Sequence, residues 1–261
     1  MRLWGNEVQH VKATGTSWGS VLSRMAALCV VLTALAEGQA SVAVNFTATS
    51  WGGGPYPLLS NETAGIVPQT YWNNTNALPA GVTADMQGPL PGRLADSAGL
   101  DSGATIVWSA EKQCGTDGGT ATPNERLYKG VIEGSWWTGS GLSVTVSQIP
   151  YAKYDVYAYL AGFGFDCTAI ARIGSQEVFY IQSSDFTTDG LIRATATSLG
   201  EATRATSARF EDLEDGSFTL DLIKQAGNRP ALAGLQIVPV PEPATGSLLA
   251  LASAWLLRRR R

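Results

Sequence analysis

The side chains able to do acid–base or nucleophilic chemistry are few in this sequence. The one histidine, His10, precedes an apolar run that we interpret as part of a removed amino-terminal segment. A Ser-His-Asp or Cys-His arrangement, or a zinc site with imidazole ligands, therefore cannot be assembled from the rest of the chain. The sequence favours a protein that is not an enzyme.

Paired carboxylates leave one catalytic alternative open, because glycoside hydrolysis needs only an acid and a base or nucleophile at a defined separation. Asp101, Glu133, Asp155 and Asp166 lie near aromatic residues or at predicted strand ends. The competing interpretation is that they are solvated acids in turns. A His-independent enzyme acting on polysaccharide is the alternative function.

Acidic turns could also hold a structural calcium ion, since calcium binds carboxylate and backbone oxygens. Asp212, Glu214 and Asp215 are the example in this chain, but their spacing does not follow the EF-hand pattern. A surface turn is the commoner explanation, so no cofactor and no metal are predicted.

Aromatic residues give the more informative pattern. In a predicted strand over residues 154–161, Asp155, Tyr157 and Tyr159 share one face while apolar residues share the other. An exposed face would be a flat platform for stacking a sugar ring, with Asp155 as a hydrogen-bonding partner. A central strand would instead bury both faces, as large aromatic side chains usually are.

Two adjacent tryptophans, Trp136 and Trp137, point in opposite directions if they lie on a strand, so one of them is expected to face outward or into a groove. The full set of candidate ligand-binding residues is Trp72, Asn73, Trp136, Trp137, Asp155, Tyr157 and Tyr159.

The charge of the central region restricts its partners. Residues 41–240 contain 4 Lys and 7 Arg against 19 Asp and Glu, a net charge of −8. Nucleic acid and anionic lipid both require a positive protein surface, so neither is an expected partner of this region.

Two cysteines remain in the central region, Cys114 and Cys167. In an oxidising compartment they can form one intramolecular disulfide, and this is the prediction. The alternative is a pair of free, buried thiols.

Period-2 alternation predicts strands over residues 41–46, 142–147 and 218–222. Residues 231–238 are predicted to form a closing strand. Gly174 and Ser175 lie between two apolar stretches and predict a hairpin turn with glycine first. Residues 201–210 fit either a helix or a strand. Short strands joined by loops of Gly, Asn, Asp and Thr predict an all-β fold, an antiparallel, jelly-roll-like β-sandwich.

One domain over residues 41–237 is expected. Residues 47–103 are poor in strand pattern and rich in Gly, Pro and Asn. They are either a long loop excursion over the sandwich or a set of short irregular strands. A loop of this length in a compact domain is itself an indication of function.

Both ends have the composition of processing segments. An apolar run over residues 25–36 follows Arg24 and precedes the small-residue pattern of Gly38, Gln39 and Ala40. Residues 1–40 are therefore a predicted signal peptide, cut by signal peptidase before Ser41.

The carboxyl end, residues 238–261, contains three elements in order. Pro241, Glu242 and Pro243 are followed by an apolar run over residues 244–257, and the chain finishes with Arg258, Arg259, Arg260 and Arg261. An arginine cluster of this kind holds the end of a membrane helix on the cytoplasmic side.

This tail resembles the PEP-CTERM sorting signal of Gram-negative bacteria. The resemblance implies export, transient anchoring in the inner membrane by the short helix, and cleavage near the motif by an exosortase. It also implies a final place at the cell surface or in the extracellular matrix.

The central region carries a further resemblance. Val44, Asn45 and Phe46, residues 67–74 and residues 233–238 are similar to segments of other PEP-CTERM ectodomains, which look galactose-binding-like. The function expected overall is a non-catalytic, carbohydrate-binding or adhesive surface domain, with exopolysaccharide as the partner. The alternatives are the paired-carboxylate enzyme and a purely structural matrix protein.

Overall fold

The computed structural model describes residues 40–47, 56–75, 87–89, 93–115, 122–135, 138–161, 167–183 and 189–241. The predicted signal peptide apart from Ala40, the sorting signal beyond Pro241, and Trp136, Trp137 and Asp166 lie outside the described residues. Residues Gln39–Pro243 form one compact unit. In the part of the chain that the structure describes, no helix is both long and apolar enough to span a bilayer.

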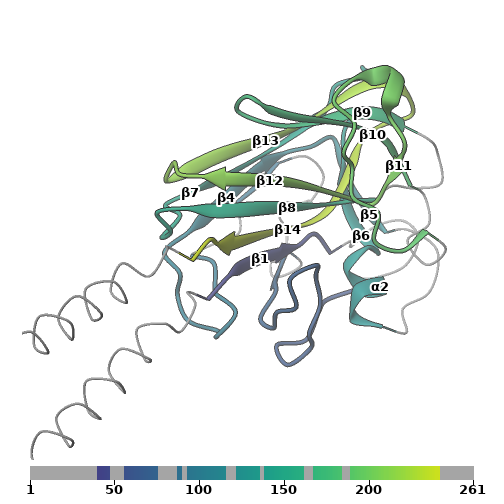
Figure 1. Cartoon of the computed structure of the whole chain (residues 1–261). Coiled ribbons are helices and arrows are strands. Elements are labelled where there is room, and N and C mark those ends of the chain that lie inside the picture. The colour runs from purple at the N-terminus through teal and green to yellow at the C-terminus, as the bar shows by residue number, and fades with distance from the viewer. Residues whose placement is uncertain are drawn as a thin grey trace, which may run out of the picture. The chain divides into compact units, whose positions relative to one another are not determined.

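The described residues form two seven-stranded sheets, here named sheet I and sheet II (Figure 1). Sheet I contains β1 (Val42–Asn45), β2 (Asn73–Asn74), β5 (Lys112–Gly115), β6 (Gly130–Glu133), β8 (Tyr154–Leu160), β12 (Ser207–Leu213) and β14 (Ala231–Pro239). Sheet II contains β3 (Gln87–Pro89), β4 (Thr105–Ser109), β7 (Leu142–Ser147), β9 (Cys167–Ile173), β10 (Gln176–Gln182), β11 (Arg204–Ala205) and β13 (Ser217–Gly227).

The two sheets enclose the main hydrophobic core, because alternate residues of facing strands point inward. Val156 and Ala158 of β8 in sheet I lie in the same buried cluster as Leu220 and Leu222 of β13 in sheet II. The prediction of a mostly β protein built from two sheets is therefore confirmed.

The prediction of purely antiparallel sheets is wrong, since both sheets are mixed. β2 runs parallel to β1 in sheet I, and β11 runs parallel to β10 in sheet II. Each of these two-residue strands lies at the end of its sheet's strand order, where a returning loop pairs with an otherwise open edge.

The strands predicted from the sequence are present as β1, β7, β13 and β14. The predicted hairpin joins β9 to β10, and Gly174 has the positive φ of +56° that the first position of its turn requires. The ambiguous segment over residues 201–210 contributes β11 and most of β12, because Ala208 and Phe210 are buried in the main core.

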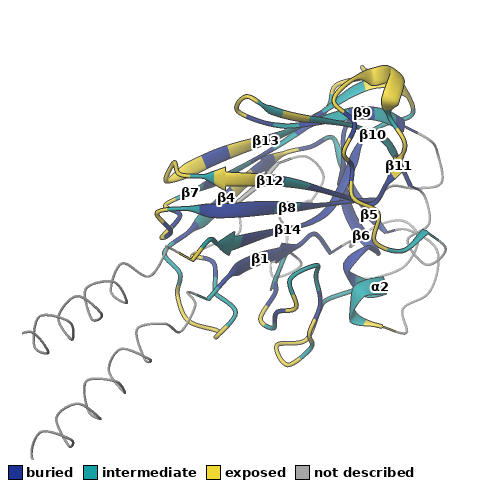
Figure 2. Ribbon diagram, in the orientation of Figure 1, coloured by how far each residue is buried: buried dark blue, intermediate teal, exposed yellow. Residues whose placement is uncertain are grey.

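The outer face of sheet I is covered by residues 56–75 and by the short helix α2 (Pro123–Leu127). Leu58 and Trp72 pack with Leu127 and with Tyr159 of β8 in a second buried cluster. Residues 56–75 therefore form a loop excursion over the sandwich, and the same long segment also contributes the short strands β2 and β3, so each of the two predicted possibilities holds in part. One consequence is that β1 is buried on both faces, although its alternation predicted a single buried face (Figure 2).

We name residues 56–75 and α2 together the cover, and local hydrogen bonds hold it in place. Thr122 and Glu125 form a capping box at the start of α2, which orients the helix. From α2, Asn124 Oδ1 accepts a hydrogen bond from the Gly65 amide at 2.9 Å, and Arg126 forms an ion pair with Glu62. The cover also approaches β14 closely, since a Cβ atom at Gly234 would lie 3.0 Å from Leu127 Cδ1.

The predicted disulfide is wrong, because both thiols are free and buried. Cys114 of β5 lies in the cluster on the outer face of sheet I, whereas Cys167 of β9 lies in the core between the sheets. Sheet I separates the two clusters. Burial raises the pKa of the Cys114 thiol above its usual range and raises that of Cys167 to about 12.

We expect both thiols of the chain over residues 41–243 to be unreactive in the folded protein. With dithionitrobenzoate at pH 8, native protein should release no thionitrobenzoate, because buried thiols with raised pKa values are neither ionised nor accessible. In denaturant without reductant, two thiols per chain should react. If denatured protein released no thionitrobenzoate, the two cysteines would form a disulfide, and this would contradict the separation of the two clusters.

Because both thiols keep their protons in the fold to higher pH than in the unfolded chain, they also make stability fall as pH rises above about 9.

Candidate functional site

The predicted row Asp155, Tyr157 and Tyr159 does share one face of β8, the outer face of sheet I. Their surroundings differ: Tyr159 is completely buried, Tyr157 is half-buried, and Asp155 is only 6% exposed. Of the three side chains, only that of Tyr157 is open enough to meet a ligand.

Tyr159 anchors the cover rather than forming a platform. Its hydroxyl donates to Gln236 Oε1 at 2.5 Å and accepts from the Ile66 amide at 2.7 Å. Its ring makes an edge contact with Trp72, with the ring centroids 5.7 Å apart. Burial raises the pKa of the Tyr159 hydroxyl. The interpretation of Tyr159 as part of an exposed stacking face is therefore wrong.

Trp72 and Asn73 are also structural. Trp72 is 5% exposed, and its Nε1 donates to the Gln69 carbonyl at 3.2 Å. Asn73 Nδ2 donates to the carbonyls of Ala43 and Ala95, both at 2.8 Å. These contacts hold the cover to β1, so neither side chain is available as a stacking or hydrogen-bonding surface.

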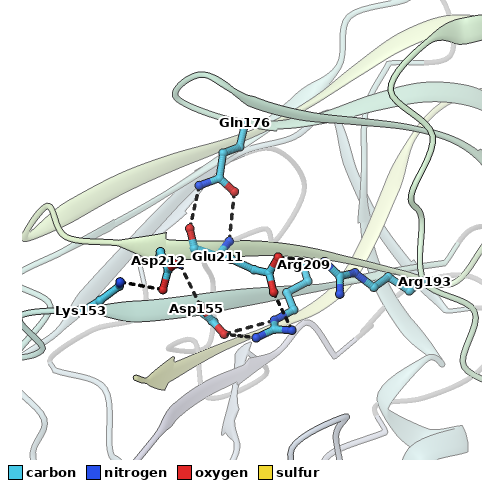
Figure 3. A network of polar contacts seen from close by, with 7 residues as sticks. All are labelled: Lys153, Asp155, Gln176, Arg193, Arg209, Glu211 and Asp212. Carbon is cyan, nitrogen blue, oxygen red and sulfur yellow. Dashed lines mark hydrogen bonds and ion pairs between the residues drawn. The ribbon is translucent and has the colours of Figure 1, made fainter. Parts of the chain in front are cut away.

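Arg209 of β12 lies beside Asp155 of this row (Figure 3). The Arg209 Nη2 and Nε atoms lie 2.6 Å and 3.1 Å from Asp155 Oδ2, and its Cζ lies 5.4 Å from the centroid of the Tyr157 ring. The hydrogen bond to Asp155 raises the pKa of Arg209, and burial raises that of Tyr157. Arg209 therefore fixes both neighbours in place.

Further charged side chains extend this arrangement. Glu211 is paired with Arg209 at 2.7 Å and with Arg193 at 3.4 Å, and Lys153 is paired with Asp212 at 2.9 Å. The Asp212 amide in turn donates to Asp155 Oδ1 at 3.0 Å. We name this set the Arg209 network; its members are Lys153, Asp155, Arg193, Arg209, Glu211 and Asp212. Three cations and three carboxylates make the network neutral.

Gln176 attaches the network to sheet II. Its side-chain amide donates to the Glu211 carbonyl at 2.8 Å and accepts from the Glu211 amide at 3.0 Å. β12 is an edge strand of sheet I, so Gln176 occupies backbone groups that another strand could otherwise pair with.

Of the four predicted acids, Asp101, Glu133 and Asp155 are described by the structure and each has an arginine partner. Asp155 is engaged by Arg209, the exposed Asp101 lies 3.5 Å from Arg93, and the buried Glu133 lies 2.5 Å from Arg229. Each of these three carboxylates therefore accepts a guanidinium contact in the folded protein.

Over the described residues, no group of three or more His, Cys, Asp or Glu side chains is placed to hold a metal ion. In the candidate calcium turn, Asp212 is paired with Lys153, and the Asp215 carbonyl accepts from the Tyr154 hydroxyl at 2.7 Å.

Sequence reasoning missed Arg193, Arg209 and Glu211. The pattern that could have found two of them is the alternation of Ala208 and Phe210 with Arg209 and Glu211. Interpreted as a strand, that segment places both charged residues on the face opposite the core. The network is therefore visible in part from the sequence.

Comparisons with known proteins give only distant similarities. No protein-family model and no curated protein matches the sequence. A Bacteroides uniformis β-glucuronidase 2 bound to a cyclophellitol aziridine is similar at a TM-score of 0.42 and 12% identity, over 78% of this chain and 18% of that one. Another Bacteroides uniformis β-glucuronidase structure is similar at a TM-score of 0.36 and 13% identity, over 77% and 18% of the two chains.

The catalytic unit of a GH87 α-1,3-glucanase from Streptomyces thermodiastaticus is similar at a TM-score of 0.26 and 18% identity, over 56% of this chain and 28% of that one. The chain thus spans less than a third of the length of each of these enzymes. Similarity at this level does not extend to activity.

We expect Tyr159→Phe to destabilise the fold by about 1–3 kcal/mol, because it leaves the Ile66 amide without its partner and removes the shorter of the two hydrogen bonds to Gln236 Oε1. Tyr157→Phe is the matched control on the same face of the same strand, and should change the free energy of unfolding by less than about 0.5 kcal/mol. Urea unfolding of both variants measures the difference. Equal effects would contradict the assignment of Tyr159 as the anchor of the cover.

Proposed function

We propose that this chain is an exported protein whose β-sandwich binds carbohydrate at a surface without catalysing a reaction. The observation that carries the proposal is the Arg209 network beside the half-buried Tyr157, on the part of sheet I that lies beyond the buried Tyr159. Planar guanidinium and carboxylate groups that hold one another in fixed orientations are pre-organised to exchange hydrogen bonds with neighbouring sugar hydroxyls.

The charges favour an uncharged polysaccharide. The Arg209 network is neutral, and residues 41–240 as a whole have a net charge of −8. A polyanion would be repelled, whereas a neutral chain meets only donors and acceptors. Exopolysaccharide of the surrounding matrix is the proposed partner.

A binding role is preferred to catalysis because the described candidate acids Asp101, Glu133 and Asp155 are each paired with an arginine.

We also propose a jelly-roll-like connectivity. It is supported by the consecutive strands β12, β13 and β14, which belong alternately to sheet I, sheet II and sheet I.

The proposal of export depends on the sequence of the two ends. Signal peptidase would remove residues 1–40, and an exosortase would recognise Pro241, Glu242 and Pro243 of the PEP-CTERM-like tail. The short apolar helix and Arg258–Arg261 would anchor the chain in the inner membrane until cleavage. The mature protein would then reach the cell surface or the extracellular matrix.

Binding is tested by depletion of the chain over residues 41–243 from solution by cellulose, chitin, curdlan and mannan, with reducing ends measured in the same tubes. We expect depletion by at least one polysaccharide without release of reducing ends. Arg193→Ala should weaken binding about 3- to 10-fold, the equivalent of about 1 kcal/mol, because it removes one hydrogen-bonding group.

Arg172→Ala is the matched control, since Arg172 is an ion-paired arginine of similar exposure on sheet II, bonded to Asp221 at 3.3 Å. This variant should bind like the unaltered protein. Depletion by none of the polysaccharides would contradict the binding function, and release of reducing ends would replace it with the enzymatic alternative.

Export is tested by replacing Pro241, Glu242 and Pro243 with alanine in a strain that has an exosortase. We expect the full-length precursor to accumulate in the inner membrane, because the cleavage motif is gone while the apolar run is intact. The control replaces Pro230 alone, outside the motif. Unchanged maturation of the triple variant would contradict the proposed sorting.

A further inference from the structure

Tyr71 has a backbone conformation that bulky residues seldom adopt. Its φ is +54°, in the left-handed region, where the side chain of an L-residue meets its own backbone. The neighbouring Trp72 is buried in the cover, but Tyr71 is 41% exposed. The strain is therefore not offset by full burial of the ring, and such outliers often mark functional positions.

The opposite loop supports the ring from one side. A Cβ atom built on Gly99 would lie 2.6 Å, 2.8 Å and 2.9 Å from Tyr71 Cε1, Cζ and Cδ1. These are three consecutive ring atoms at nearly equal distances, which places the approach above the face of the ring rather than at its edge. The Gly99 backbone therefore covers one face, and glycine is required there because any side chain would displace the ring.

Hydrogen bonds fix the backbone on both sides of the ring. Thr70 Oγ1 donates to the Ser97 carbonyl at 2.9 Å, which joins the two loops, and within residues 56–75 the Tyr71 amide donates to the Ser60 carbonyl at 3.3 Å. Asp96 Oδ1 accepts from the amide of Leu100 at 2.9 Å, which closes the loop that carries Gly99. The orientation of the ring is thus set before any ligand arrives.

Two exposed apolar residues follow or precede the residues that contact Tyr71. Leu59 precedes Ser60 and is 59% exposed, and Leu100 follows Gly99 and is 65% exposed. We name Leu59, Tyr71, Gly99 and Leu100 the Tyr71 platform. A flat, supported aromatic ring with apolar neighbours presents the kind of surface on which the apolar face of a pyranose ring packs.

We propose that the Tyr71 platform is a stacking subsite for one pyranose ring of an uncharged polysaccharide. The inference rests on the proposed carbohydrate-binding function and adds the residue that makes the stacking contact. An anionic lipid surface is disfavoured by the net charge of −8 of the region. A second copy of the chain would need about 800 Å² of contact per partner, far more than three side chains supply.

The decisive variant is Tyr71→Asn, because asparagine tolerates positive φ and has no aromatic ring. In depletion isotherms with the polysaccharides used above, it should bind at least 10-fold more weakly than the unaltered protein, while its melting temperature is equal or higher. A merely structural tyrosine would give a lower melting temperature instead, and that result would overturn the proposal.

Two further variants complete the test. Tyr71→Phe keeps the ring and should bind like the unaltered protein; a loss of binding would overturn stacking as the contact. Leu199→Ala removes a side chain of similar exposure, 49%, from the short helix η2 (Leu199–Glu201) and should have no effect.

The outcomes separate the two proposals. If the unaltered protein binds a polysaccharide and Tyr71→Asn binds it equally well, the platform is overturned while the carbohydrate-binding function stands. If the unaltered protein binds none of the polysaccharides, both proposals are overturned together.

Discussion

The hydrogen bonds that close residues 56–75 over sheet I are the constraint on which the rest of the structure depends. Gln236, fully buried on β14, donates to the Val67 carbonyl at 2.5 Å and to Gln69 Oε1 at 2.8 Å, and accepts from the Tyr159 hydroxyl. Each of these polar groups would be costly to bury alone, so they stabilise the cover only as a complete set. The cover in turn makes sheet I a buried layer.

The extent of the cover determines which residues on the outer face of sheet I are exposed to solvent. Along one face of β8 the environment changes from the fully buried Tyr159 to Tyr157 beside Arg209, although the three side chains of the row are equivalent in the alternation. The same loop turns Trp72 inward and Tyr71 outward. The conformation of one loop therefore contributes both to the second hydrophobic cluster and to the exposed aromatic ring.

The charged side chains of the Arg209 network form ion pairs with one another, so no charge of one sign is in excess there. Arg209 joins Asp155 to Glu211, and Gln176 ties the same strand to sheet II. The exposed Glu211 pair adds little stability by itself, whereas the buried Asp155 carboxylate needs its arginine partner. This fixed, neutral set of donors and acceptors is the feature on which the proposed binding of an uncharged, hydroxyl-rich molecule rests.

The sequence by itself determined the elements whose pattern is local: the alternating strands β1, β7 and β13, the closing strand β14, the hairpin at Gly174, the acidic charge and the absence of histidine from the central region. Only the tertiary structure decided which faces are buried, because burial depends on a loop that pairs Ile66 with Tyr159, 93 residues away. It also decided that Cys114 and Cys167 lie on opposite sides of sheet I. Alternation places a side chain on a face, but long-range packing decides what covers that face.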